Sequence, residues 1–127
     1  MIYLDSSVLL AQLLAEDRKP DPSLWREPLV SSRVLEYEVW VRLHARGLAG
    51  SHGDAARELL AHVSLLELHP LVLARALEVF PSPVRTLDAL HLASMEYLRG
   101  RRMTLRLATY DDRLRAAARS LGIDCLA

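Results

Sequence analysis

Several acidic residues in this sequence stand at the ends of predicted strands and helices. Asp5 follows the apolar run at residues 1–4, and Asp111 follows the segment L-R-L-A-T-Y. Carboxylates gathered at one place repel each other and acquire raised pKa values. A hard divalent cation that takes oxygen ligands, chiefly Mg²⁺ or Mn²⁺, relieves this repulsion. The candidate residues for such a centre are Asp5, Glu38, Asp88 and Asp111, with Asp112 as a further candidate beside Asp111.

Each of these acids also has a purely structural explanation. Asp5 can cap the helix that follows it, and one aspartate of the pair at 111–112 can cap the last helix. Asp88 lies in a first helical turn, where an acid interacts favourably with the helix dipole by about 0.3–1 kcal/mol. Glu38 can form an exposed pair with Arg42 worth about 0.3–0.5 kcal/mol. Taken one at a time, the acids do not decide between a structural and a functional role.

Two glutamates compete for the place on the second helix. Glu36 and Glu38 are two residues apart, so their side chains point roughly 200° from each other and at most one faces a given site. Glu38 shares a helical stripe with Val34 and Val41, where a carboxylate is costly unless it is paired or coordinated. The periodicity favours Glu38 without excluding Glu36.

One histidine lies close to the acids in sequence. His91 follows Asp88 by three residues and is in principle able to bind a metal ion. Metal binding would require several convergent ligands. The interpretation that fits an apolar helix better is a packed or hydrogen-bonded histidine.

The elements that position these residues alternate between strands and helices. This alternation predicts a three-layer α/β/α sandwich with a central parallel sheet of four to five strands, in one domain spanning residues 1–127. In open α/β sheets the ligand crevice lies at the carboxyl ends of the strands. We predict helix N-caps at Ser6 or Ser7, Ser32, Ser51 and Thr86. The expected strands are 1–5, 29–31, 65–69, 105–109 and 123–126, and the expected helices are 7–16, 33–46, 51–63, 70–80, 87–99 and 111–121, although 64–68 also suits an extension of the preceding helix.

The composition excludes several classes of protein. The chain has 127 residues, 51% hydrophobic and 25% charged, with a formal net charge of zero. Zero net charge argues against coating nucleic acid by bulk charge, although a local basic rim remains compatible with it. Lys19 is the only lysine, so the sequence contains neither the G-K-[ST] of a P-loop nor the late lysine of a phosphoacceptor receiver domain.

The sequence indicates a cytoplasmic protein that does not enter a membrane. Cys125 is the only cysteine, so no internal disulfide can form, which suits a reducing compartment. The first apolar run has no basic residue before it, and polar residues interrupt it well before the roughly 18 residues that a membrane span requires.

Four motifs in order resemble the PIN-domain family, and more closely the VapC-type toxins of bacterial toxin–antitoxin pairs. They are Y-L-D-S-S-V-L, V-S-S-R-V-L-E-Y-E-V-W-V-R, L-D-A-L-H-L-A and L-A-T-Y-D-D-R-L-R-A-A-A-R-S-L-G-I, and together they extend over essentially the whole chain. The resemblance assigns the family's four acids to Asp5, Glu38, Asp88 and Asp111, and so selects Glu38 over Glu36. Ser6 stands where threonine is common in the family.

The resemblance implies an endoribonuclease that depends on Mg²⁺ or Mn²⁺. In-line attack on an RNA phosphodiester would leave a 5′-phosphate and a 3′-hydroxyl. Asp5, Asp88 and Asp111 would bind the ion, with Glu38 binding a second ion or positioning the water and Asp112 assisting. Arg42, Arg85 and Arg113 are weaker candidates for contacts with RNA phosphates.

The family resemblance also implies partners. Members usually form homodimers and are silenced by a small antitoxin that covers the acidic groove. Trp40 and Leu43 on the second helix are candidates for an interface, although packing in the core explains them equally well. Two other functions fit the sequence: a PIN nuclease of RNA maturation, and a PIN-like module that binds RNA or protein without cleaving. The four acids argue against the non-catalytic module.

Overall fold

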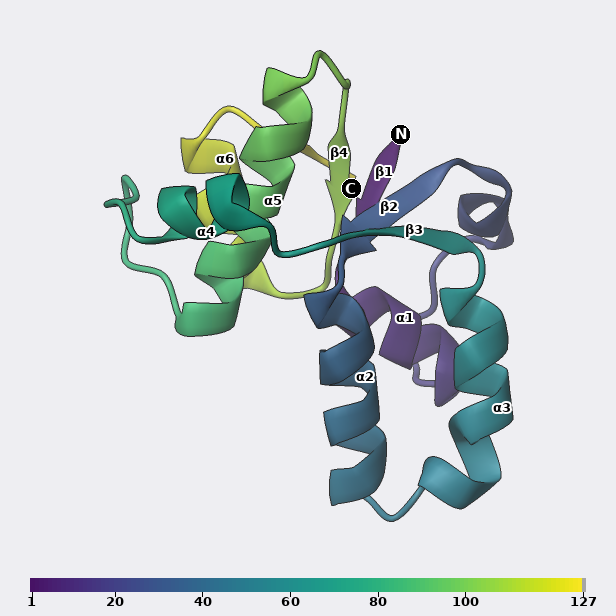
Figure 1. The fold of residues 1–127 in the computed structure, drawn as a ribbon. Helices are drawn as coiled ribbons and strands as arrows, with labels where there is room; N and C mark the ends of the chain where they lie inside the picture. Colours follow the sequence, from purple (N-terminus) through teal and green to yellow (C-terminus); the bar gives the residue numbers. More distant parts are fainter. Residues whose placement is uncertain (127) are drawn as a thin grey trace.

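The structure is a computed structural model that describes residues 1–126 and contains a five-stranded sheet (Figure 1). The strand order is β3-β2-β1-β4-β5, and every neighbouring pair is parallel. This confirms the predicted parallel sheet. The strands are β1 (Ile2–Leu4), β2 (Leu29–Ser32), β3 (Val63–Leu66), β4 (Arg106–Ala108) and β5 (Asp124–Cys125).

Helices cover both faces of the sheet, as the three-layer prediction requires (Figure 1). One face packs against α1 (Ser6–Leu13), α2 (Val34–Ala45) and α3 (Ala49–Leu60). The other packs against α5 (Thr86–Gly100) and α6 (Asp112–Ser120), and α4 (Pro70–Ala76) lies against α5. A short 3₁₀ helix, η1 (Pro22–Arg26), forms in the proline-rich connection between α1 and β2.

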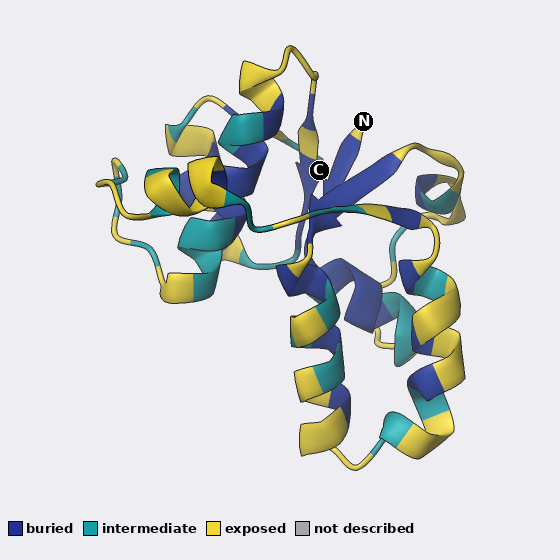
Figure 2. Ribbon diagram, in the orientation of Figure 1, coloured by how far each residue is buried: buried dark blue, intermediate teal, exposed yellow. Residues whose placement is uncertain are grey.

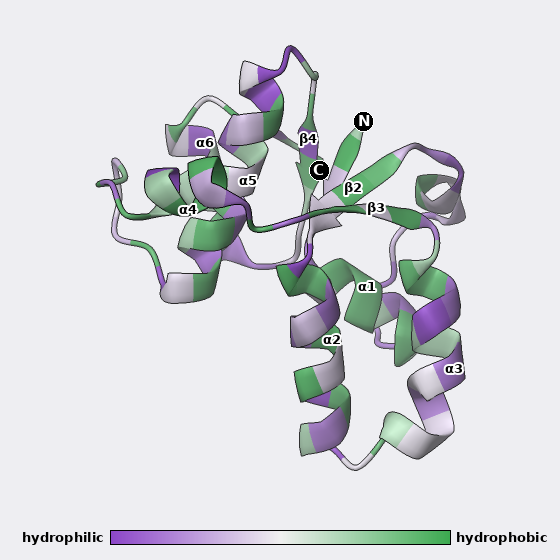
Figure 3. Ribbon diagram, viewed as in Figure 1, coloured by the Kyte–Doolittle hydropathy of each residue, from purple (hydrophilic) through white to green (hydrophobic). Residues whose placement is uncertain are grey.

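The central strand β1 explains why the chain begins with an uninterrupted apolar run. Side chains of a strand alternate between the two faces of a sheet. Tyr3 packs into the cluster formed with α5 and α6, while Ile2 and Leu4 pack into the cluster formed with α1, α2 and α3. All three are buried, and both faces of the sheet are apolar beneath exposed outer helix surfaces (Figures 2 and 3). A strand buried on both faces needs apolar residues at every position.

None of the serines and the threonine predicted as N-caps occupies that position. Asp5, which was the alternative to Ser6 or Ser7, caps α1: its side chain accepts from the Ser7 backbone N–H. The predictions at Ser51 and Thr86 are wrong, because α3 begins earlier, at Ala49, and Thr86 is itself the first residue of α5. Ser32 comes closest to its predicted role, because its Oγ accepts from the Val34 N–H at 3.1 Å.

Several element boundaries also differ from the prediction, among them those of β3 and α4. Strand β3 begins at Val63, two residues before the predicted 65–69, so the segment is a strand and not a helical extension. Helix α4 ends at Ala76 and does not reach Phe80. Beyond that point Leu77 and Val79 are 89% and 90% exposed, so no packed surface supports further helical turns.

Among residues 1–126, no helix is long and apolar enough to cross a bilayer.

Candidate metal centre

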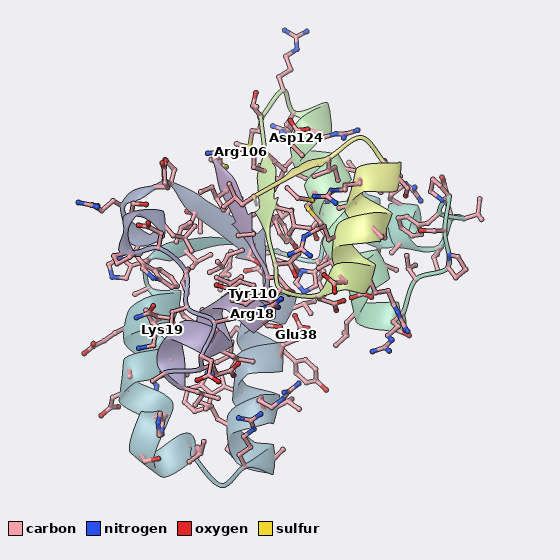
Figure 4. The ribbon with its side chains drawn as sticks, turned by 180° about the vertical axis from the view of Figure 1, so that it is seen from behind. Arg18, Lys19, Glu38, Arg106, Tyr110 and Asp124 are labelled. Carbon is pink, nitrogen blue, oxygen red and sulfur yellow. The ribbon has the colours of Figure 1, made fainter. Side chains whose placement is uncertain are left out.

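A pocket of about 570 Å³ lies at the carboxyl ends of β1 and β4, bordered by α1, α2 and α5. In Figure 4, Glu38, Arg18 and Tyr110 gather at this end of the sheet, whereas Arg106 and Asp124 mark its opposite end. The parallel arrangement brings to one place residues that are far apart in sequence. The lining includes all four of the predicted acids: Asp5, Glu38, Asp88 and Asp111.

Asp5 is 5% exposed, and one of its carboxylate oxygens is fully engaged by neighbouring donors. Its Oδ2 accepts from the Ser7 hydroxyl at 2.6 Å, from the Thr109 hydroxyl at 2.8 Å and from the Ser7 backbone N–H at 3.4 Å. These bonds satisfy that oxygen and fix the orientation of the buried side chain. Within residues 1–126, Oδ1 has no protein donor, and it remains available to a ligand in the pocket.

The same two hydroxyls connect Asp5 to the loop that carries Asp111. Ser7 Oγ accepts from the Tyr110 N–H at 2.9 Å, and Thr109 Oγ1 accepts from the Asp111 N–H at 2.9 Å. Asp111 Oδ1 in turn accepts from the N–H groups of Arg113 and Leu114, so Asp111 caps α6. The structural and candidate functional roles of Asp5 and Asp111 therefore coexist, because a cap uses only one carboxylate oxygen.

Glu38 is held by a buried histidine on α5. Glu38 Oε1 lies 2.5 Å from His91 Nε2, and His91 Nδ1 lies 2.7 Å from the hydroxyl of Tyr3 on β1. His91 is 1% exposed and Tyr3 is fully buried. Burial opposes the charged form of His91, but the hydrogen bond to Glu38 and the nearby negative charges outweigh it and raise the pKa of His91. The prediction of a hydrogen-bonded histidine agrees with this arrangement.

Asp88 lies in the first turn of α5 and has the least local support of the four acids. Burial raises the pKa of its carboxyl, and the negative charges of Asp111 and Asp5 raise it further. Arg85 and His91 oppose this shift without cancelling it. The pocket is lined by five acidic side chains, which include Glu16, and by three arginines, and a bound cation would relieve the repulsion among the acids.

Comparison with known proteins decides the family. The model of the PIN domain family matches residues 2–120.

The chain belongs to the PIN-domain family. It is 40% identical over 129 aligned residues to "Ribonuclease VapC46" of Mycobacterium tuberculosis, an alignment that covers 99% of this chain and 96% of that protein. "Ribonuclease VapC47" of the same species is 31% identical, with 96% and 93% covered. Within the PIN family the chain is therefore of the VapC type, as its motifs suggested.

A solved structure shows the same fold at low sequence identity. A chain of the "Toxin-antitoxin complex from Klebsiella pneumoniae" superposes with a TM-score of 0.70 at 17% identity, covering 100% of this chain and 97% of that one. Such a likeness establishes the α/β architecture, and the site must be argued from its own residues.

Other predicted residues of this PIN domain are divided between the pocket and the surface outside it. Arg42 and Arg85 line the pocket. Asp112 and Arg113 are absent from its lining, and the Asp112 carboxylate, 88% exposed, pairs with Arg115. Glu36 also lies elsewhere, with its Oε2 3.5 Å from Arg33.

Two expectations for the second helix are not supported, one a structural ion pair and the other an interface residue. In the described part of the chain, no ion pair joins Glu38 to Arg42, because Glu38 turns to His91 instead. Leu43 is fully buried in the core, which removes it from the candidate interface. Trp40 is partly buried against the same core, with Arg57 stacked 4.8 Å from its ring centroid.

The pocket also contains residues that were not predicted from the sequence. Arg18, which follows α1, lies with its Cζ 5.2 Å from the ring centroid of Tyr110, and both residues line the pocket. Ser7 and Thr109 were not predicted to hold Asp5. The hydroxyl of Thr109 could have been suspected from its place two residues before Asp111, but no sequence signal places Arg18.

The donor set fits a divalent cation that prefers oxygen ligands. Asp5, Glu38 and His91 each offer one ligand atom, and these three atoms lie within 4.8 Å of one another. Asp88 and Asp111 line the same pocket. The His91 nitrogens already face Tyr3 and Glu38, so the donors left for an ion are carboxylate oxygens. Carboxylate oxygen suits Mg²⁺, Ca²⁺ and Mn²⁺ better than softer metals.

Proposed function

We propose that this VapC-type PIN domain, residues 1–127 acting as one unit, is an endoribonuclease that cleaves RNA phosphodiester bonds with Mg²⁺, for which Mn²⁺ can substitute. The observation that carries the proposal is the convergence of Asp5, Glu38, Asp88 and Asp111 on one pocket. The names of the related VapC proteins, which are called ribonucleases, support RNA as the substrate.

The protein groups have distinct tasks in this proposal. Asp5, Asp88 and Asp111 would bind the cation through oxygens left free by the helix caps and hydroxyl contacts, and Glu38 would complete the site or orient the attacking water. The bound cation would supply positive charge against the reacting phosphate and lower the pKa of a water molecule. Arg42, Arg85 and Arg18 line the same pocket and would contact RNA phosphates.

The proposal is tested by RNA cleavage with a matched pair of variants. We would incubate a mixed RNA pool with the wild type, Asp88→Asn and Asp54→Asn, each with Mg²⁺, with Mn²⁺ and with EDTA. Asp54 is a suitable control because its carboxylate is fully exposed on α3 and pairs with Arg57, away from the pocket. We expect Asp88→Asn to lose at least about 10²-fold in rate, the scale of losing one group that stabilises developing charge. Asp54→Asn should cleave like the wild type.

Two outcomes would count against this function. Equal cleavage by the wild type and Asp88→Asn would indicate a contaminating nuclease. Wild-type protein that neither cleaves the pool nor gains thermal stability with Mg²⁺ or Mn²⁺ would favour a PIN-like binding module.

The proposal includes an antitoxin partner. The fold neighbour comes from a toxin–antitoxin complex, and the pocket has excess negative charge around Asp88. A basic side chain of an antitoxin inserted there would be attracted by the uncompensated carboxylates. Co-expression with the product of an adjacent reading frame, followed by the cleavage assay, tests whether this partner silences the enzyme.

Self-association and cellular location complete the proposal. Leu71, Leu77 and Val79, in α4 and just after it, are 68%, 89% and 90% exposed, and exposed apolar side chains of this kind suit a homodimer interface. We place the protein in the cytoplasm, where RNA is found and where the single thiol, Cys125, would stay reduced.

A further inference from the structure

The contact between Glu38 and His91 joins three elements through one continuous hydrogen-bonded chain. Tyr3 is on β1, His91 on α5 and Glu38 on α2. The two links measure 2.7 Å and 2.5 Å, and the rings of Tyr3 and His91 meet edge to face at 87°. Tyr3 and His91 are buried, whereas the Glu38 side chain retains 19% exposure and lines the pocket.

Chemistry determines the direction of the first link. An ionised Glu38 can only accept hydrogen bonds, so the hydrogen at the contact belongs to His91 Nε2. Nδ1 accepts from the Tyr3 hydroxyl in the neutral ring and donates to it in the imidazolium. Burial raises the pKa of Tyr3 far above its ordinary value, so the phenol keeps its proton and can take either part in this contact. In both forms of the ring Nε2 donates to Glu38, so the contacts connect Tyr3 through His91 to Glu38 Oε1.

The chain leaves only one oxygen of Glu38 for the pocket. Oε1 faces His91, and within residues 1–126 Oε2 has no protein donor. A glutamate side chain has three rotatable torsions, and holding one oxygen restricts all three. Carboxylates and histidines that bind metals are commonly oriented by such outer contacts, and losing an outer contact typically weakens metal affinity by 10- to 100-fold.

We propose that His91, fixed by Tyr3, is a positioning residue that holds the Glu38 carboxylate toward the cation pocket. This rests on the proposed function only in assuming that the pocket binds a divalent cation, and it does not depend on which RNA is cut. His91 acts through Glu38 and does not touch the ion, because both of its ring nitrogens are engaged by protein groups.

The measurement is the dissociation constant for Mn²⁺, determined by calorimetry on folded protein without RNA. His91→Leu removes the hydrogen bond at similar bulk, and we expect it to weaken Mn²⁺ binding about 10-fold or more. His91→Gln can place an amide N–H near the position of Nε2 and should recover most of the affinity. Tyr3→Phe deletes a single oxygen and should give a smaller loss than His91→Leu.

A core variant on the same helix separates positioning from general loss of stability. Met95 is fully buried one turn beyond His91 on α5 and does not line the pocket. Met95→Ala should lower the melting temperature while leaving the Mn²⁺ dissociation constant unchanged. Asp5→Asn shows that the measured binding is at this pocket, because it should weaken Mn²⁺ binding strongly.

Several results would overturn the inference. A folded His91→Leu protein that binds Mn²⁺ as tightly as the wild type would do so, as would an equal loss of affinity in Met95→Ala. A directly coordinated imidazole nitrogen in the pulsed electron paramagnetic resonance spectrum of the Mn²⁺-loaded wild type would make His91 a ligand instead. Wild-type protein that binds no Mn²⁺ would refute both proposals. Mn²⁺ binding that depends on His91, in a protein that cuts no RNA, would leave the inference standing and refute only the nuclease.

Discussion

Among the four acids of the pocket, Asp88 has a carboxyl whose pKa is raised by folding. Burial and the carboxylates of Asp111 and Asp5 raise its pKa in the folded protein. Between its ordinary and its raised pKa, the folded state holds a proton that the unfolded chain has released. The free energy of unfolding therefore rises as the pH falls through the raised pKa, because the folded state binds more protons.

Asp88→Asn removes this pH-dependent contribution to the free energy of unfolding and gives a testable prediction. In metal-free protein at neutral pH, we expect Asp88→Asn to be as stable as the wild type or more stable, although it loses activity. This advantage should shrink as the pH is lowered, because wild-type Asp88 becomes neutral as well. Urea unfolding of both proteins at several pH values, with EDTA, measures the difference. An advantage for Asp88→Asn that grows at lower pH would contradict the raised pKa.

Two neighbouring serines offer a matched comparison at the same scale. Ser7 Oγ donates to Asp5 and accepts from the Tyr110 N–H, whereas Ser6 Oγ makes no hydrogen bond with residues 1–126. We expect Ser7→Ala to lower the free energy of unfolding by about 1–3 kcal/mol, because it leaves partly buried groups without a partner. Ser6→Ala should change it by less than about 0.5 kcal/mol. Chemical denaturation of both variants checks this, and equal losses would contradict the assigned hydroxyl contacts.

At the scale of elements, two glycines in α3 differ in their surroundings. A Cβ added at Gly53 would lie 3.1 Å from the Trp40 ring on α2, whereas one added at Gly50 would meet nothing within 4 Å. We expect Gly50→Ala to stabilise the protein by up to about 1 kcal/mol, through the higher helix propensity of alanine. Gly53→Ala should gain less or lose stability, because Trp40 must move. Thermal unfolding of both variants gives the order, and a larger gain for Gly53→Ala would contradict this packing.

The sequence was most informative about elements whose signals are local. The apolar runs at β1, β2 and β4 and the alternation with helices predicted the parallel sheet, and the rule for strand ends placed Asp5 and Asp111 at one edge. Helix starts were less predictable, because α3 begins at Ala49 without any side-chain cap. Helix α3 instead follows a turn in which Gly47 has a positive φ of 67°.

Contacts between distant residues could not be predicted from patterns along the chain. Glu38 and His91 are 53 residues apart, and Thr109 and Asp5 are 104 apart. Helical periodicity left Glu36 and Glu38 unresolved, and only the family resemblance chose between them. The structure adds a physical reason for that choice, since Glu38 is the one that meets a buried donor.

At the scale of the whole molecule, the apolar surface around α4 is the expected site of self-association. Leu77→Glu should convert a homodimer into a monomer without lowering stability, because Leu77 is 89% exposed. Val41→Glu places the same charge on the exposed side of α2, where Val41 is 46% exposed, and should leave the dimer intact. Light scattering after size-exclusion chromatography measures the mass. A monomeric wild type, or a dimer lost only in Val41→Glu, would contradict the α4 interface.

The strand order also has a consequence for when the pocket can form during synthesis. Central β1, made first during synthesis, must wait for β4 and for the hydroxyl of Thr109 before Asp5 is held in place. Asp111 arrives later still. A chain that is only partly translated therefore lacks both the inner strand pairing and one of its four acids, and long-range pairing of this kind forms slowly. Translation itself therefore delays the assembly of the pocket until β4 and Asp111 have been made.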